Sequence, residues 1–345
     1  MTAPTTTVPS TPGATTAATT IAASAPARPA IRVRGLRKTF GKQVVLDGID
    51  LDVAEGTVFA LLGPNGAGKT TAVHILATLI PADAGEVVIG GHDITRQPDA
   101  VRHSIGLTGQ VSAVDGQFTG EENLRLMADL QHLGREEGRR RVSGLLERFD
   151  LVEAATKPAA TYSGGMRRRL DLAMTLVGEP RIIFLDEPTT GLDPRSRRVM
   201  WDIVRELVAD GVTIFLTTQY LEEADRLASR IALLDAGRVV AEGTPAELKR
   251  LVPGGSVRLE FGDVADLERA AAALGSAASR DEQALALQVA NDGGVHTLRA
   301  LLERLDAARV EVDGLSVRSA DLDDVFLSLT GRTDGHHDGV EAPTR

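Results

Sequence analysis

The stretch at residues 63–71, which reads GPNGAGKTT, constrains this chain more than any other. Three glycines in nine residues cost backbone entropy and add nothing to a hydrophobic core, so the stretch needs another reason to exist. It matches the pattern G-x-x-x-x-G-K-T, follows the apolar run VFALL and opens a helical pattern. This context predicts a loop that binds phosphate between a strand and a helix.

Each part of the loop has a chemical role in holding a triphosphate. The glycines let backbone N–H groups turn toward the β-phosphate, and the helix N-terminus adds unpaired donors and partial positive charge. Lys69 can reach the β- and γ-phosphates, and the Thr70 hydroxyl can bind Mg²⁺. The alternative is a glycine-rich turn that binds nothing. The predicted nucleotide-binding residues are Gly63, Pro64, Asn65, Gly66, Ala67, Gly68, Lys69, Thr70 and Thr71.

A second motif, RIIFLDEP, places two carboxylates at the end of an apolar strand. Asp186 is expected to orient Mg²⁺ and its waters. Glu187 is expected to polarise the water that attacks the γ-phosphate. Alone, the pair could be surface carboxylates at a strand end. Together with the glycine loop, it predicts a site that hydrolyses a nucleoside triphosphate.

Composition limits the kinds of partner and site. The formal net charge is -10, from 38 basic and 48 acidic residues, which argues against nucleic acid as the main partner. The sequence has no cysteine, which excludes disulfides, thiolate zinc sites and cysteine nucleophiles. No apolar run approaches the roughly 18 to 20 residues that cross a membrane. A cytosolic location is therefore expected, and any membrane-spanning part must belong to another chain.

The pattern along the chain predicts two folded domains between two tails. Residues 1–29, rich in Thr, Ala, Pro and Ser, and residues 332–345 are predicted to be disordered. Strands TVFALL, RIIFLD, VTIFLTT and RIALLD have the continuous apolar runs of parallel strands buried on both faces. Helical patterns cover 68–79, 120–133, 136–149, 165–177 and 196–209, and IRVRGL and GEVVIGG suggest an attached antiparallel sheet. Residues 256–331 predict a small α+β domain with helices at 264–274, 294–307 and 321–329, for which a ferredoxin-like fold is one candidate.

The stretch YSGGMRRRLDLAMTL, residues 162–176, resembles the LSGGQ signature of the nucleotide-binding domains of ABC transporters. Ser163, Gly164 and Gly165 match, whereas Tyr162 and Met166 replace Leu and Gln. A serine hydroxyl and glycine amides at a helix start can bind an anion. The resemblance implies that this element closes over ATP bound to a second copy of the chain, so that the chain works as a homodimer.

The same resemblance implies the fold class and further site residues. It implies an α/β P-loop NTPase domain over 30–250, with an antiparallel β subdomain and a helical subdomain at about 111–178. Gln110 resembles the glutamine that touches Mg²⁺ or water and senses the membrane partner, with Gln117 as the alternative. Phe40 lies where the family stacks an aromatic ring on adenine. Asp193 resembles the residue that crosses the dimer interface, and the arginines after it are expected to be solvated (Arg195, Arg197 and Arg198).

The chain departs from the family pattern at Gln219, where a histidine is usual. A neutral amide can donate to the γ-phosphate but cannot carry charge or shuttle a proton, so we expect an active but slow ATPase. GLTGQVSAVDGQFTGEENL, TTQYLEEAD and DLDDVFLSLTG together resemble drug-export ATPases of the daunorubicin/doxorubicin-resistance type, over about residues 31–331. The resemblance implies an ATP- and Mg²⁺-dependent subunit that powers a separate integral-membrane permease at the cytoplasmic face of the membrane.

Two other classes of function remain open. A soluble ABC ATPase that acts on ribosomes or DNA usually carries two cassettes, long coiled coils or zinc cysteines, whereas this sequence has one cassette and no cysteine. A nucleotide-gated interaction module is the second alternative, in which Gln219 marks lost hydrolysis. The sequence encodes neither the permease, the cargo nor the direction of transport.

Overall fold

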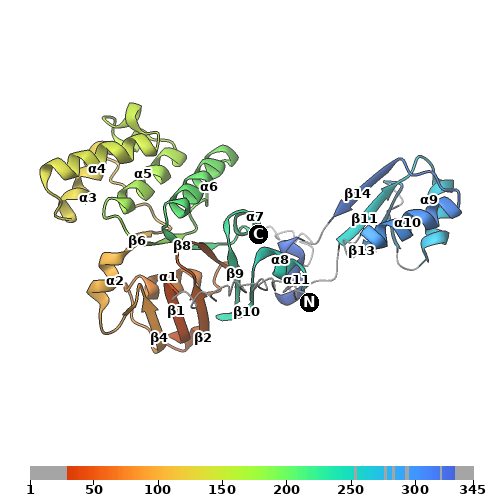
Figure 1. Cartoon of the computed structure of the whole chain (residues 1–345), viewed down its shortest axis with the longest axis horizontal. Helices are drawn as coiled ribbons and strands as arrows, with labels where there is room; N and C mark the ends of the chain where they lie inside the picture. Colours follow the sequence, from red (N-terminus) through yellow and green to blue (C-terminus); the bar gives the residue numbers. More distant parts are fainter. Residues whose placement is uncertain are drawn as a thin grey trace, which may run out of the picture.

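The centre of the protein is a six-stranded sheet with the order β10-β9-β3-β8-β7-β6. The computed structural model (Figure 1) describes residues 29–251, 255–275, 278–281, 284–291, 295–318 and 321–330. Five strands run parallel, and β10 pairs with β9 antiparallel. Their bounds are β3 Val58–Leu62, β6 Ile105–Thr108, β7 Ile182–Asp186, β8 Thr213–Thr218, β9 Arg230–Asp235 and β10 Arg238–Gly243.

Successive side chains of the parallel strands fill two different cores. Phe184 of β7 and Phe215 of β8 belong to the cluster on one face, whereas Leu185 and Leu216 belong to the cluster on the other. Both faces are buried, which explains why the predicted strands are apolar at consecutive positions.

An antiparallel sheet covers one of these faces, as predicted. It has the order β2-β1-β4-β5, and β2 was not recognised in the sequence. The bounds are β1 Ile31–Phe40, β2 Gln43–Val53, β4 Ala84–Ile89 and β5 His92–Asp93. Helices α1 (Lys69–Leu76) and α2 (Pro98–Ser104) connect it to the central sheet.

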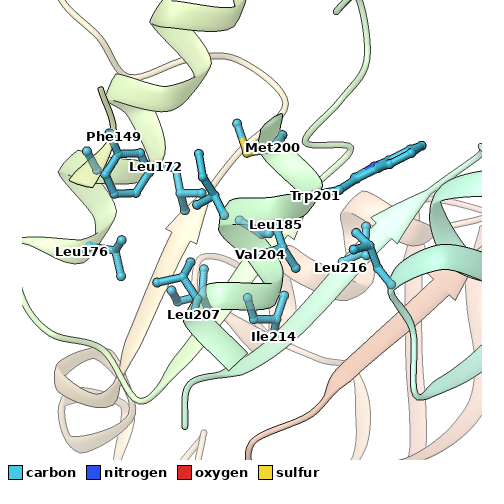
Figure 2. Packing of buried hydrophobic residues seen from close by; sticks show 14 of the residues in the cluster. Phe149, Leu172, Leu176, Leu185, Met200, Trp201, Val204, Leu207, Ile214 and Leu216 are labelled. Carbon is cyan, nitrogen blue, oxygen red and sulfur yellow. The ribbon is translucent and has the colours of Figure 1, made fainter. Parts of the chain in front are cut away.

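The helical subdomain lies on the other side of the sheet (Figure 1). It contains α3 (Gly120–Leu130), α4 (Arg135–Arg148) and α5 (Gly164–Leu176), with short 3-10 helices at Val152–Ala154 and Ala159–Thr161. A capping box between Thr119 and Glu122 fixes the start of α3. Figure 2 shows that the subdomain shares one core with α6 (Pro194–Ala209) and the sheet, including Phe149, Leu172, Leu176, Leu185, Val204, Leu207, Ile214 and Leu216.

The small C-terminal domain is α+β, with its own apolar cluster around Val257, Leu259, Leu267 and Leu305. Its sheet order is β12-β13-β11-β14 with antiparallel neighbours, which is the ferredoxin-like arrangement. The bounds are β11 Gly255–Glu260, α9 Val264–Leu274, β12 Ala278–Asp281, β13 Ala286–Asn291, α10 Val295–Ala307 and β14 Gly314–Arg318. In Figure 1 this domain extends away from the ATPase domain.

The last helix, α11 (Leu322–Thr330), lies apart from the strands that precede it. From its sequence this helix was expected in the C-terminal domain, but it contacts α7 (Leu221–Leu227) and α8 (Pro245–Lys249) of the ATPase domain. Leu322 and Val325 are buried in the same cluster as Leu248. An amphipathic pattern shows that a helix has an apolar face but not which surface that face meets, so sequence order was misleading here.

The predicted disordered tails, 1–29 and 332–345, lie outside the described residues except for Pro29. Among the residues that the structure describes, no helix is both long enough and apolar enough to cross a bilayer.

Candidate active site

The central sheet brings the predicted motifs to one edge. Leu62 of β3 pairs with Thr218 of β8, and Asp186 of β7 pairs with Thr217. The carboxyl ends of these parallel strands are therefore neighbours. The glycine loop after β3, the carboxylates at the end of β7 and Gln219 after β8 all lie at that edge.

Two glycines of the loop have no space for a side chain. A Cβ atom on Gly63 would lie 2.3 Å from the carbonyl oxygen of Leu234, and one on Gly68 would lie 2.7 Å from Cδ2 of Leu46. Gly68 also has a φ of +109°, which other residues rarely adopt. The N–H of Gly63 donates to the carbonyl of Thr218 at 3.2 Å, which fixes the loop against β8.

The remaining loop residues form an accessible tip and a helix start. Asn65 and Gly66 are exposed, Pro64 is half-buried and Ala67 is buried. Thr70 and Thr71 are half-buried in the first turn of α1. The loop therefore presents its backbone at the N-terminus of a helix, the arrangement that suits a phosphate group.

Lys69 is the buried cation of the site. Only 5% of the residue is exposed. Its Nζ donates to the carbonyl oxygens of Gly63 and Pro64 at 2.8 and 3.1 Å. The same nitrogen lies 3.2 Å from Oε1 of Glu187. Lys69 thus connects the glycine loop directly to a carboxylate at the end of β7, a contact that the sequence did not predict.

Asp186 provides a buried oxygen that suits a metal ion. The Thr217 hydroxyl donates to its Oδ1 at 2.5 Å. Its Oδ2 is buried and has no hydrogen-bond partner among the described residues. A buried carboxylate oxygen without a partner is unfavourable. The hard oxygen ligands of Asp186 and Thr70 are of the type that Mg²⁺ prefers.

Glu187 is held in an unusual backbone conformation. Its φ is +48°, in the left-handed region that is costly for a residue with a side chain. Its N–H donates to the carbonyl and the hydroxyl oxygens of Thr217 at 3.2 and 3.1 Å. Its Oε2 accepts from the Thr190 hydroxyl at 3.2 Å. The carboxylate is therefore fixed at both oxygens, by Lys69 and by Thr190.

The glutamines occupy different places. Gln219 is half-buried immediately after β8. Gln110 is exposed two residues after β6, the strand next to β7. Gln117 is exposed near the start of α3, in the helical subdomain. Position in the sheet therefore favours Gln110 over Gln117 as the residue beside the carboxylates.

The signature residues form the exposed N-terminus of α5. The Ser163 side chain caps the helix by accepting from the Met166 N–H at 3.2 Å. Ser163 and Gly164 are exposed. A Cβ atom on Gly165 would lie 2.4 Å from Oγ of Ser196, so this glycine allows α5 to pack against α6. Tyr162 is buried and donates to the Ala154 carbonyl at 2.7 Å, which explains how it replaces leucine.

Asp193 and Phe40 are accessible, each with a local contact. Asp193 caps α6 by accepting from the N–H groups of Arg195 and Ser196 at 2.9 and 3.0 Å. The Ser196 hydroxyl also donates to it, and these bonds hold the pKa of Asp193 below its usual range. Phe40 is 50% exposed, and Nζ of Lys38 lies 5.3 Å from its ring centroid. Its ring is thus available for stacking.

One arginine after Asp193 is not simply solvated. Arg195 and Arg198 are exposed, as predicted. Arg197, however, is half-buried, and its guanidinium lies 4.9 Å from the ring centroid of Tyr220. The prediction was wrong for Arg197 because its aromatic partner follows β8, far along the chain.

A buried carboxylate four residues after Gln219 was not predicted from the sequence. Glu223 in α7 is fully buried and accepts from Nε1 of Trp201 at 3.1 Å. Burial raises the pKa of Glu223 above its usual value. In the sequence it is one of two adjacent glutamates in LEEAD, and nothing there distinguishes it from its exposed neighbour Glu222.

Comparisons with known proteins agree with this geometry. The family model described as ABC transporter matches residues 46–190. The daunorubicin resistance ATP-binding protein DrrA3 of Streptomyces coeruleorubidus is 49% identical over 305 residues, which are 88% of this chain and 96% of that protein. A Nod factor export ATP-binding protein I of Ralstonia nicotianae is 40% identical over 88% of this chain and 94% of that protein.

Solved structures match the ATPase domain. The ATP-binding subunit of an ABC transporter has a TM-score of 0.58 and 30% identity, covering 64% of this chain and 92% of that chain. A dimeric ATP-binding cassette bound to ADP and phosphate has a TM-score of 0.57 and 26% identity, covering 62% of this chain and 98% of that chain. The chain therefore belongs to the family of ABC transporter ATP-binding proteins, which are ATPases coupled to transport, and within that family it resembles the daunorubicin/doxorubicin-resistance type.

Proposed function

We propose that the chain powers the export of a hydrophobic small molecule through a separate integral-membrane permease, which it joins at the cytoplasmic face of the membrane. The observation that carries the proposal is the meeting of Lys69, Asp186 and Glu187 at one sheet edge, with both acidic side chains buried. Relatives of this chain are named for daunorubicin resistance and Nod factor export, which supports export of a small molecule.

The site residues divide the work of ATP hydrolysis. Lys69 and the loop amides bind the phosphates, and the ring of Phe40 stacks on the adenine. Asp186 and Thr70, with Gln110 close by, hold Mg²⁺, which when bound neutralises phosphate charge. Glu187 orients and polarises the attacking water as general base. Gln219 donates a neutral hydrogen bond to the γ-phosphate.

A homodimer completes this site. Ser163 and Gly164 are exposed at the N-terminus of α5, where a serine hydroxyl and free amides can meet the nucleotide of a second copy. Asp193 is exposed beside them at the start of α6 and contributes to the contact between copies. A solved cassette that is 26% identical to this chain is described as dimeric, which supports the proposal.

Hydrolysis separates this proposal from a nucleotide-gated interaction module. The experiment is phosphate release by purified protein with ATP and Mg²⁺, with Glu187→Gln as the matched variant that keeps the side-chain shape. We expect slow turnover for the natural chain and little for Glu187→Gln, because an amide cannot act as a base. Equal rates for the two proteins would refute the proposed role of Glu187.

A transport assay distinguishes the proposed export function from that of a soluble ATPase. The neighbouring reading frames are first searched for a multi-span membrane protein, the chain is co-expressed with the one found, and ATP-dependent uptake of an anthracycline is measured in inverted vesicles. We expect uptake that Glu187→Gln abolishes. Recovery of ribosomes without any integral membrane protein, and no uptake, would support the soluble alternative instead.

The dimer has a test of its own. Glu187→Gln binds ATP without consuming it and should therefore accumulate a closed dimer, visible by light scattering with ATP. The permease complex is measured in parallel, since the permease holds two copies together. A one-to-one complex of chain and permease that still hydrolyses ATP would count against the homodimer.

A further inference from the structure

Arg168 makes four hydrogen bonds from a buried position in α5. Only 9% of the residue is exposed. Its Nε donates to the Pro188 carbonyl at 2.9 Å, and Nη2 donates to the Asp186 carbonyl at 3.2 Å. Its Nη1 donates to the Gly109 carbonyl at 2.7 Å and to Oδ2 of Asp171 at 3.1 Å. One planar guanidinium thus joins three separate segments of the chain.

Two of these bonds fix the backbone on both sides of Glu187. The carbonyls of Asp186 and Pro188 belong to the residues immediately before and after it. Glu187 itself has a φ of +48°, a strained conformation for a residue with a side chain that persists only when surrounding contacts enforce it. The rigid fork of an arginine is suited to holding two carbonyls at a set separation.

Of the other two bonds, one reaches the loop that carries Gln110 directly and the other reaches it through Asp171 of α5. Gly109 directly precedes Gln110, and Oδ1 of Asp171 accepts from the Ala113 N–H at 3.0 Å. Burial lowers the pKa of Arg168 and raises the pKa of Asp171 relative to their usual values. Both side chains are buried, with 9% and 3% of the residues exposed, and they depend on each other and on the backbone for partners.

We propose that Arg168 is a positioning residue for hydrolysis. It holds Glu187 in its catalytic backbone conformation and ties that conformation to the position of the loop at Gly109 and Gln110. This inference rests on the proposed role of Glu187 as general base. Arg168 acts on hydrolysis only through the main chain and not by touching a phosphate.

Three variants test the inference. Arg168→Met keeps the apolar stem and removes all four bonds, whereas Arg168→Lys keeps the charge but loses the planar fork. Arg169→Met is the matched control, because Arg169 lies next in α5 and donates to the Phe149 carbonyl at 2.7 Å, away from β7. We expect kcat to fall by up to about 100-fold in Arg168→Met, as small misplacements of a reacting group can cause. Arg168→Lys should lie in between, and the Kd for ATP should change by less than about threefold, because Lys69 and the loop are untouched.

A double-mutant cycle distinguishes positioning from a merely structural role. If Arg168 acts through Glu187, Arg168→Met should change the residual turnover of a Glu187→Gln protein by less than about threefold. If the fold-losses in turnover of the two single variants multiply fully in the double variant, the inference is overturned. Hydrogen exchange should also become faster in peptides that cover 109–113 and 186–190, while Arg169→Met leaves them unchanged. Unaltered exchange in these peptides would equally overturn it.

The outcomes separate this inference from the proposed function. Glu187→Gln with natural turnover would refute the role of Glu187, whereas natural kcat in Arg168→Met refutes only the role of Arg168. If Arg168→Met does not fold, Arg168→Lys is carried through the same cycle, and natural kcat in that variant overturns the inference.

Discussion

Glu187→Gln should bind ADP more tightly than the natural chain does. Lys69 lies 3.2 Å from the Glu187 carboxylate, and the two side chains are only 4% and 6% exposed. A nucleotide phosphate must therefore compete with Glu187 for the same ammonium group. Replacing the carboxylate with an amide removes the competing charge while leaving an oxygen that can accept from Lys69.

The expected gain in ADP affinity follows from the distance between Lys69 and Glu187. At 3.2 Å and an effective dielectric constant of about 20, the attraction between the two charges is roughly 5 kcal/mol. Lys69 keeps its two carbonyl acceptors and gains the amide oxygen, so only part of that energy is released to the nucleotide. If about 1.4 kcal/mol of this attraction becomes available for binding the nucleotide, ADP affinity should rise about tenfold.

The assay is calorimetric titration with ADP in the absence of Mg²⁺. ADP isolates the phosphate loop because it has no γ-phosphate. Glu223→Gln is the matched control, since Glu223 is also a buried carboxylate but contacts Trp201 and not Lys69. The gain should persist at high salt, because a buried pair is poorly screened. Unchanged ADP affinity, or a gain that salt abolishes, would refute the competition.

Three further predictions concern neighbouring positions. Gln219→His should introduce a pH dependence of ATPase rate near the histidine pKa of about 6.5, and indistinguishable rates for Gln, His and Ala would show that residue 219 does not reach the reacting phosphate. Val325→Ala removes two buried methyl groups of α11, whose burial is worth about 1.6 kcal/mol before any cavity cost. Urea unfolding should therefore show that the free energy of unfolding falls by about 2 kcal/mol. An unchanged free energy of unfolding would contradict the packing of this helix. Burial raises the pKa of Glu223, so its contribution to folding is present below the usual glutamate pKa and is lost as pH rises through the folded pKa. Glu223→Gln should therefore gain stability relative to the natural chain as the pH rises above the usual glutamate pKa, and a stability difference that stays constant with pH would contradict this.

The sequence predicted the parts of the site whose chemistry is local. Gly63 and Gly68 are required by close approach and by φ, so a loop of this kind leaves a recognisable pattern. The apolar runs before Asp186 and Gln219 are required by burial on both faces of a sheet. These constraints act on neighbouring residues and can be recognised without knowing the fold.

Other features depend on partners distant in the sequence. Arg168 and Arg169 are adjacent in a run of three arginines, yet one is buried against β7 and the other binds the end of α4. Arg197 is half-buried because of Tyr220, and α11 docks because of Leu248 and its neighbours. No local pattern encodes such contacts, so the positioning of Glu187 became visible only in three dimensions.

The return of α11 gives the C-terminal domain the topology of an insertion. The chain leaves the ATPase domain after α8 and returns to it with α11, which packs against α8 and α7. Residues 255–318 therefore form a domain inserted between α8 and α11. The two ends of this domain lie side by side, because Ser256 of β11 pairs with Arg318 of β14. The inserted domain can therefore be lengthened, shortened or exchanged during evolution without displacing α11, the helix that follows it.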